Sequence, residues 1–307
     1  MAIQAGDAVW TIRGDIGELK SSLDEATGEV EKASGNVTQS FATVGKGMTA
    51  VGAAITAPLA LGVKAAIDFG SGLAGVASLG VQDMGKIEDA VRSVAVQYGQ
   101  DLTVAVQGTY QAISAGVSEM EAPYVLEQAA IAATAGQTDL TTAIELGAAM
   151  TNAFGLEMGN MQGVFDSAFV AVKYGVTTFE ELSSSAGKTA PAFAAAGLSV
   201  DEMYGAVAAL TKGGLGTAES FTSLNAVIAS FTRQGEVGKL ETLGLEGALK
   251  WLAETTGGNQ TAMLEFLGST EAMTAVLSLT GGQAQSFNEI LGQMAEKTGA
   301  AGGAVGI

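Results

Sequence analysis

The sequence Gly197-Leu198-Ser199-Val200-Asp201-Glu202-Met203 contains the signals that end one helix and begin the next. A glycine that follows an apolar run can adopt the left-handed conformation that closes a helix at low steric cost. Ser199 can cap the following helix, and Glu202 stands three residues later, at capping-box spacing. This stretch therefore predicts a tight turn between two helices.

Similar turns recur through the centre of the chain, from Gly99 to Gly216. The glycines that close the predicted helices follow one another at intervals of 17 to 22 residues, which suits a helix of roughly 12–16 residues and a short turn. Thr178 and Glu181 indicate a second capping box. The predicted helix-closing glycines are Gly99, Gly116, Gly136, Gly155, Gly175, Gly197 and Gly214.

The apolar residues between these turns follow helical spacing. Two stripes are clearest, one of Met158, Met161, Phe165, Ala168 and Val172, the other of Met203, Val207 and Leu210. A single short helix does not bury such a stripe by itself, so the helices must pack on their neighbours. The predicted fold is all-α: an array of short antiparallel helices punctuated by glycine turns and preceded by an amphipathic N-terminal helix.

Composition restricts the chemistry of the chain. The 307 residues include no Cys and no His, which excludes disulfides, thiolate nucleophiles, Ser–His triads and most transition-metal sites. Fourteen basic and 32 acidic residues give a net charge of −18. A chain of this charge repels nucleic acid, so we expect no specific nucleic-acid binding.

The N-terminal region carries a heptad pattern after a possible short strand at 8–12. Its apolar positions step alternately by three and four residues, and charged residues lie between them. The pattern fits either a coiled-coil seam for self-association or an amphipathic helix that packs on its own protein. The possible seam consists of Ile16, Leu19, Leu23, Ala26, Val30, Ala33 and Val37.

Residues 47–63 contain no charged side chain and are rich in alanine and glycine. Seventeen residues is the lower limit for a membrane span, so insertion into a membrane is one interpretation of this segment. Close packing of a small-residue helix against other helices is the other. The glycine-dense stretch 69–81 that follows predicts a linker.

These signals divide the chain into five parts. We expect the strand and heptad helix in 1–45, the apolar segment and linker in 46–82, and the helical core domain in 83–235. Further short helices are expected in 236–297, and a Gly/Ala-rich tail in 298–307, which we interpret as a truncation point.

No motif in the sequence predicts catalysis. Gly187-Lys188-Thr189 resembles the end of a phosphate-binding loop, but the first glycine of that motif is replaced by Leu182 and no strand precedes it. The glycines of 213–216 lack the βαβ context of a dinucleotide site. The pairs Glu180/Glu181 and Asp201/Glu202 suit the first turns of helices, where they complement the helix dipole. We expect a protein that is not an enzyme and has no cofactor or metal.

The block from about Ile87 to Thr232 resembles the core region of tail tape measure proteins of long-tailed bacteriophages. The resemblance rests on sequence elements in a fixed order, namely Ala132-Ala133-Thr134-Ala135-Gly136 before Asp139-Leu140, then Phe154-Gly155-Leu156, then Lys188 to Ser199, then Gly213-Gly214-Leu215-Gly216-Thr217-Ala218. Upstream, Ile55-Thr56-Ala57-Pro58-Leu59 is similar to a short apolar segment of the family. Downstream, Leu243-Gly244-Leu245 and Phe266 to Ala272 also fit.

The resemblance implies a structural virion protein that lies in the lumen of the tail tube, and in the host cytoplasm during assembly. Such a protein sets tail length and is released when DNA is ejected. Its implied partners are tail tube and tail assembly proteins, and we also expect a homo-oligomer. Family members are usually longer, so we interpret this chain as the N-terminal part. The alternative function is a membrane-active helical protein that inserts 47–63, with transient membrane contact.

Overall fold

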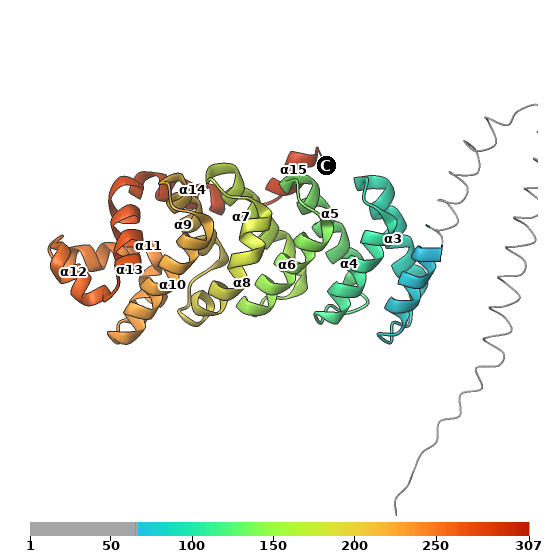
Figure 1. Cartoon of the computed structure of the whole chain (residues 1–307), viewed down its shortest axis with the longest axis horizontal. Coiled ribbons are helices and arrows are strands. Elements are labelled where there is room, and N and C mark those ends of the chain that lie inside the picture. Colours follow the sequence, from blue (N-terminus) through green and yellow to red (C-terminus); the bar gives the residue numbers. More distant parts are fainter. Residues whose placement is uncertain (1–64, 66, 307) are drawn as a thin grey trace, which may run out of the picture. The chain divides into compact units, whose positions relative to one another are not determined.

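A computed structural model describes residue 65 and residues 67–306 of the chain (Figure 1). Every regular element in this part is a helix, which confirms the all-α prediction. The heptad seam Ile16 to Val37, the possible strand at 8–12 and the apolar segment 47–63 lie outside the described residues. The predictions made for them stay predictions.

The described part begins with a helix over residues 67–77. The labelled helices that follow are α3 (Met84–Tyr98), α4 (Leu102–Ser114), α5 (Ala122–Gly136), α6 (Leu140–Phe154), η1 (Met158–Asn160), α7 (Met161–Tyr174), α8 (Phe179–Ala195), α9 (Val200–Lys212), α10 (Thr217–Arg233), α11 (Val237–Thr255), α12 (Gln260–Leu267), α13 (Thr270–Leu277), η2 (Ser278–Gly282), α14 (Ala284–Ala295) and α15 (Ala300–Val305).

Helices α3 to α10 form a regular array of helical hairpins, which we call the repeat array (residues 84–233). The odd-numbered helices begin at residues 84, 122, 161 and 200, and the even-numbered helices at 102, 140, 179 and 217. Both series advance by 38 or 39 residues. The structural unit is therefore a pair of helices, and the spacing of about 20 residues seen in the sequence is half of its period.

The hairpins stack in two layers (Figure 1). Each helix packs on the helix two places along the chain, so that α5 lies between α3 and α7, and α8 lies between α6 and α10. Because successive helices alternate in direction, neighbours within one layer run parallel. The apolar stripes predicted from the sequence face the interior of the array. Their residues Met161, Phe165, Met203, Val207 and Leu210 are all buried.

Most turns between the helices use a glycine in the left-handed region. Gly116, Gly155, Gly197 and Gly214 have φ values of 102°, 61°, 73° and 100°, and Gly99 has a φ of 66°. After the first four, the next residue donates its N–H to a carbonyl five residues back, as in the Schellman motif. These bonds run from Val117 to Ala112, Leu156 to Thr151, Leu198 to Phe193 and Leu215 to Leu210, at 2.9 to 3.2 Å.

Two of the seven glycines differ from the left-handed conformation expected. Gly136 is the last residue of α5, and Gln137 takes the left-handed conformation instead, with a φ of 53°. Gly175 ends α7 in an extended conformation, with a φ of −99°. Both positions need glycine for space, because a Cβ at Gly136 would overlap the ring of Phe179 and one at Gly175 would lie 2.8 Å from Cα of Ala208.

Both predicted capping boxes are formed. In the box that begins α9, the Ser199 N–H donates to Glu202 Oε2 at 2.9 Å and the Glu202 N–H donates to Ser199 Oγ at 3.2 Å. Thr178 and Glu181 make the equivalent pair at the start of α8. Capping residues also repeat with the hairpins, since Asp101 and Asp139 begin α4 and α6, 38 residues apart.

Two segments expected to lack regular structure are helical. The predicted linker 69–81 is helical through residue 77, and Phe69 and Val76 are buried. Its glycines allow close approach, because a Cβ at Gly72 would lie 2.6 Å from Cγ1 of Val106 on α4. The predicted tail 298–307 contains the short helix α15, which packs on α5 and α7.

The chain turns back after α10, and we call residues 237–305 the C-terminal return. Helix α13 packs on α10, α14 packs on α9 and α7, and α15 packs on α5 and α7, so the return runs along the array toward its beginning (Figure 1). The short helices predicted in 236–297 are present as α11 to α14. Helix α11 is broken at Gly244, which has a φ of 69° and a ψ of 177°.

Candidate interaction surfaces

The sequence that resembles a phosphate-binding loop lies in the middle of α8. Gly187, Lys188 and Thr189 are helical, so their backbone N–H groups belong to intrahelical hydrogen bonds and do not line a loop. The glycines of 213–216 form the turn between α9 and α10. Neither segment is arranged to bind a nucleotide phosphate.

The carboxylates at the helix starts connect neighbouring helices. Glu181 accepts a hydrogen bond from Thr217 Oγ1 at 2.8 Å, which joins α8 to α10. Glu202 accepts the Leu245 N–H at 2.8 Å, directly after the break in α11. Thus Glu181 and Glu202, two of the acids predicted to complement the helix dipole, also hold helices together.

The pKa values of two side chains in the array, Tyr98 and Asp139, are shifted by their surroundings. Burial raises the pKa of Tyr98 to about 12, and the hydrogen bond that its hydroxyl donates to Glu127, at 3.0 Å, adds to the effect. Burial would also raise the pKa of Asp139, but hydrogen bonds from the Thr142 hydroxyl and N–H hold that pKa below its ordinary value. Both perturbations come from contacts that fix helices.

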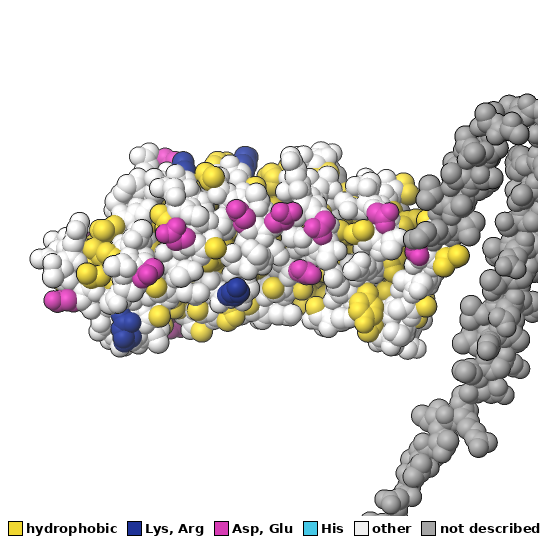
Figure 2. Space-filling view, viewed as in Figure 1, with side chains coloured by type: hydrophobic (Ala, Val, Ile, Leu, Met, Phe, Trp, Pro, Cys, Tyr) yellow, Lys and Arg dark blue, Asp and Glu magenta, His cyan; other side chains and the backbone are white. Residues whose placement is uncertain are grey.

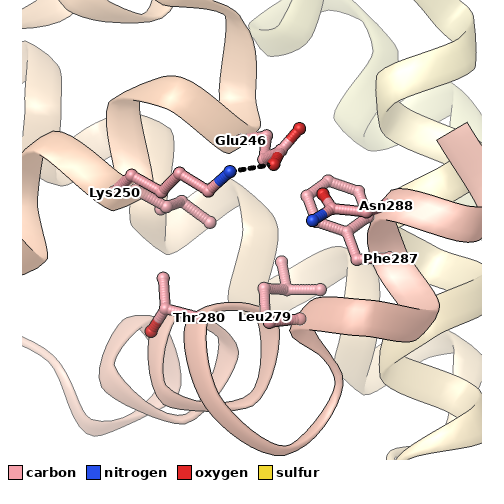
Figure 3. Close-up of a pocket in the computed structure, with 8 residues that line it drawn as sticks. Glu246, Lys250, Leu279, Thr280, Phe287 and Asn288 are labelled. Carbon is pink, nitrogen blue, oxygen red and sulfur yellow. Dashed lines mark hydrogen bonds and ion pairs between the residues drawn. The ribbon is translucent and has the colours of Figure 1, made fainter.

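The cavities in the part of the chain that the structure describes include two small ones. The first measures about 40 Å³ and lies between α11 and the η2–α14 segment (Figure 3). Glu246 and Lys250 form an ion pair at its edge, and Leu279, Phe287 and Asn288 line the rest. Its volume is far below the roughly 300–1,000 Å³ of most small-molecule sites.

The second cavity measures about 190 Å³ and lies between α5, α7 and α15. Its lining includes Gln128 and Ile131 from α5, Phe165 and Asp166 from α7, and Gly299 from the return. Small-molecule sites usually occupy roughly 300–1,000 Å³. Across residues 67–306, no group of three or more acidic side chains is placed to hold a metal ion.

Exposed carboxylates recur along one edge of the repeat array. They lie at the N-terminal ends of the even-numbered helices, and these ends meet at the same edge because the hairpins repeat. The residues are Asp101, Asp139, Glu180, Glu181 and Glu219. Figure 2 shows acidic side chains along the visible face of the array, with few basic ones among them. Such a surface disfavours phosphate backbones and suits a basic partner.

Exposed large apolar side chains gather at the two ends of the described array. Val96 and Met120 are 87% and 86% exposed near its beginning, and Leu243 and Leu264 are exposed near its far end. Val176, in the middle, is the exception. No helix within residues 67–306 combines the length and the apolarity needed to cross a bilayer.

One functional candidate was missed by the sequence analysis. Asp166 on α7 is 1% exposed, and its carboxylate accepts the N–H of Gly299 at 2.8 Å and that of Ala301 at 2.9 Å. The only local signal is that an acid follows Phe165 within an apolar helix face. Its partners lie 133 and 135 residues away, where the sequence gives no indication of them.

These features define a helical-repeat protein. In the part that the structure describes, most charged side chains either connect helices or lie on the surface. Residues 92–305 match the sequence profile of the phage-related minor tail protein family, and the chain belongs to this family. A search of curated proteins and a search of solved structures each gave no match. The chain is therefore a phage tail protein with a structural role in the tail.

Proposed function

We propose that this chain is the N-terminal core part of a tail tape measure protein. The observation that carries the proposal is that several of the sequence elements that resemble tape measure proteins lie at turns of the repeat array. Gly136 to Leu140 spans the α5–α6 turn, Phe154-Gly155-Leu156 the α6–α7 turn and Gly213 to Ala218 the α9–α10 turn. The resemblance thus follows the residues that determine the hairpin architecture.

The geometry of the array limits how it takes part in length measurement. Stacking one more hairpin lengthens a layer by about 8–10 Å, the usual distance between packed helices. The same 38 residues would span about 57 Å as one continuous helix. In this proposal the folded array is an assembly module, and extended helical segments encoded elsewhere in the same gene measure the tail.

The proposed role is structural and not catalytic. The use of Glu181, Glu202 and Asp166 to connect helices supports this. The partners in this proposal are the tail tube and tail assembly proteins, and the place of action is the tube lumen of the virion tail. The acidic edge of the array would face basic surfaces of such partners.

The proposal is tested by in-frame deletions across the whole gene in the phage that encodes this chain. Electron microscopy of the tails gives their length. Deletions in extended helical segments should shorten the tail by about 1.5 Å per residue removed. Deletion of one hairpin, residues 122–160, should leave it nearly unchanged, whereas an extended array would shorten it by about 58 Å. Tails of constant length in every deletion that still assembles would contradict the tape measure function.

Self-association through the heptad seam is a separate part of the proposal. Leu19, Leu23 and Val30 supply its apolar contacts if two or more chains meet there. Leu23→Asp would place a charge in that contact and should lower the mass of the protein in solution, measured by light scattering. Glu25→Gln, off the seam, is the matched control. Equal masses for wild type and Leu23→Asp would mean that the seam is not an oligomer contact.

A further inference from the structure

The last described residues form a distinct element, which we call the C-terminal strap (residues 296–305). It leaves the end of α14 and lays the six-residue helix α15 across α5 and α7. Its main anchor is Asp166 of α7, whose two carboxylate oxygens accept the N–H groups of Gly299 and Ala301. The carboxylate is buried, and these two hydrogen bonds replace the ones it would make to water.

A second anchor stands beside the first. Lys297 Nζ lies 2.6 Å from Asp201 Oδ2, and the other oxygen of Asp201 accepts a hydrogen bond from Ser167 Oγ, also at 2.6 Å. Ser167 follows Asp166 on α7, so the two anchors hold the strap at one place. The Lys297 and Asp201 side chains are only 18% and 32% exposed, which limits the screening of this pair by salt.

The apolar contacts of the strap are small: Ala300 and Val305 are partly buried against the core. Ala301 is its only buried hydrophobic residue, and three of its residues, Gly299, Gly302 and Gly303, are poor helix formers. A helix of six residues does not form in isolation. The cavity of about 190 Å³ between the strap, α5 and α7 shows that the strap covers this surface without filling it.

We propose that the C-terminal strap is a releasable clasp, held closed by Asp166 and Asp201, which fixes where the polypeptide leaves the repeat array. Release of the strap would break few apolar contacts and would leave the hairpins of the array folded. The cavity beside Asp166 then admits water to solvate its carboxylate. Opening would free the C-terminal end of the chain for extension while the array stays folded. The opening itself is independent of the proposed function; only its use in tail assembly rests on that function.

Hydrogen exchange measured by mass spectrometry on the full chain tests the clasp. Asp166→Asn keeps the shape of the side chain but removes its charge and one acceptor. It should raise exchange in residues 296–305 by at least about tenfold and leave α5 and α6 unchanged. Asp201→Asn should cause a smaller increase, and Glu219→Gln, an exposed first-turn acid on α10, should cause none. Unchanged exchange in the strap, or an equal rise throughout the array, would overturn the proposal.

A second measurement leaves the anchors intact, in case Asp166→Asn does not fold. Because the chain has no Cys, a single engineered cysteine reports its own exposure through thiol labelling. Ala301→Cys in the strap should be labelled under native conditions at least about ten times faster than Ala133→Cys, which lies buried in α5. Equal protection of the two cysteines would show that the strap opens only when the array unfolds.

Discussion

The repeat array and the C-terminal return consist of the same kind of secondary structure but are held together over different distances in sequence. Polar contacts between hairpins join residues 29 to 40 positions apart, as in Tyr98–Glu127 and Thr217–Thr177. Contacts that dock the end of the return span 96 to 135 positions, as in Lys297–Asp201 and Ala301–Asp166. Local signals therefore specify the array, whereas a few carboxylates that are distant in sequence specify where the end of the return is docked.

The return also contains α-helices that are shorter than any α-helix in the array. Helices α3 to α10 have 13 to 17 residues, whereas α12 and α13 have eight each and α15 has six. Short helices depend on their tertiary partners, because they do not form alone. An aromatic cluster provides such a partner where the array meets the return: the rings of Phe231 on α10, Trp251 on α11 and Phe266 on α12 have centroids 5.2 to 6.1 Å apart.

The largest single-residue effect is expected in the core of the array. The Phe193 ring on α8 is fully buried, so Phe193→Ala should lower the free energy of unfolding by about 3–5 kcal/mol. Met120→Ala, at an 86% exposed position, should change it by less than about 0.5 kcal/mol. Denaturant titration followed by circular dichroism measures both. Similar values for the two variants would mean that the array has no cooperative core at α8.

Gly175 and Gly163 offer a matched pair of glycines around α7. Gly175→Ala would push a Cβ against the backbone of α7 and α9, with Ala171 O at 2.7 Å, and should destabilise the protein by about 1–3 kcal/mol. A Cβ added at Gly163, within α7, would have no neighbouring atom within 4 Å. Gly163→Ala should therefore stabilise the protein by about 0.5–1 kcal/mol. If Gly175→Ala raised the melting temperature as Gly163→Ala is expected to do, the hairpins would not approach one another as closely as the structure indicates.

The smallest effect concerns pH and compares one carboxylate from each region. Hydrogen bonds hold the pKa of Asp139 in the array below its ordinary value of 3.8, against the opposing effect of burial. The pKa of Glu271 in the return is also lowered, chiefly by its own backbone N–H and by Ser269. A carboxyl group whose pKa is lowered by folding stabilises the folded protein at pH values above its ordinary pKa. This stabilisation is lost as the pH falls through the lower pKa of the folded state.

Asp139→Asn and Glu271→Gln should therefore each reduce the loss of thermal stability between pH 5 and about pH 2. Melting midpoints across this range measure the effect, with Glu219→Gln as the control. A steeper decline with falling pH in either variant would contradict the assigned direction.

Local structure in the array was predictable because its determinants are adjacent in sequence. Ser199 with Glu202, and Thr178 with Glu181, lie within one helical turn of each other, and both boxes are formed. The space required at Gly136 and Gly175 was not predictable, since it is set by Phe179 and Ala208 on other helices. The anchor at Asp166 was missed for the same reason, because its partners are backbone groups that any sequence possesses.

The doubled period shows a different limit of sequence reasoning. Odd and even helices end with similar glycine turns, so the pattern repeats with each helix although the structure repeats with each pair. Asp101-Leu102 and Asp139-Leu140, 38 residues apart, already show the true period. By themselves they fit two similar turns equally well, because the residues that cap a helix do not show the direction in which the helix runs.

The hairpin period is the central claim, and deletion of a whole or half repeat from the full chain tests it most directly. Removing residues 122–160 joins the end of one hairpin to the start of another and preserves the alternation of helices. Removing only 140–160 would join α5 directly to α7, two parallel neighbours, with no residues to return along a helix of about 22 Å.

Circular dichroism during thermal unfolding distinguishes the outcomes. We predict that the chain lacking 122–160 keeps its helical content per residue and unfolds in one cooperative transition. The chain lacking the smaller segment 140–160 should lose both properties, although it retains more residues. Equal folding of the two chains, or better folding of the half-repeat deletion, would contradict an array built from helical hairpins.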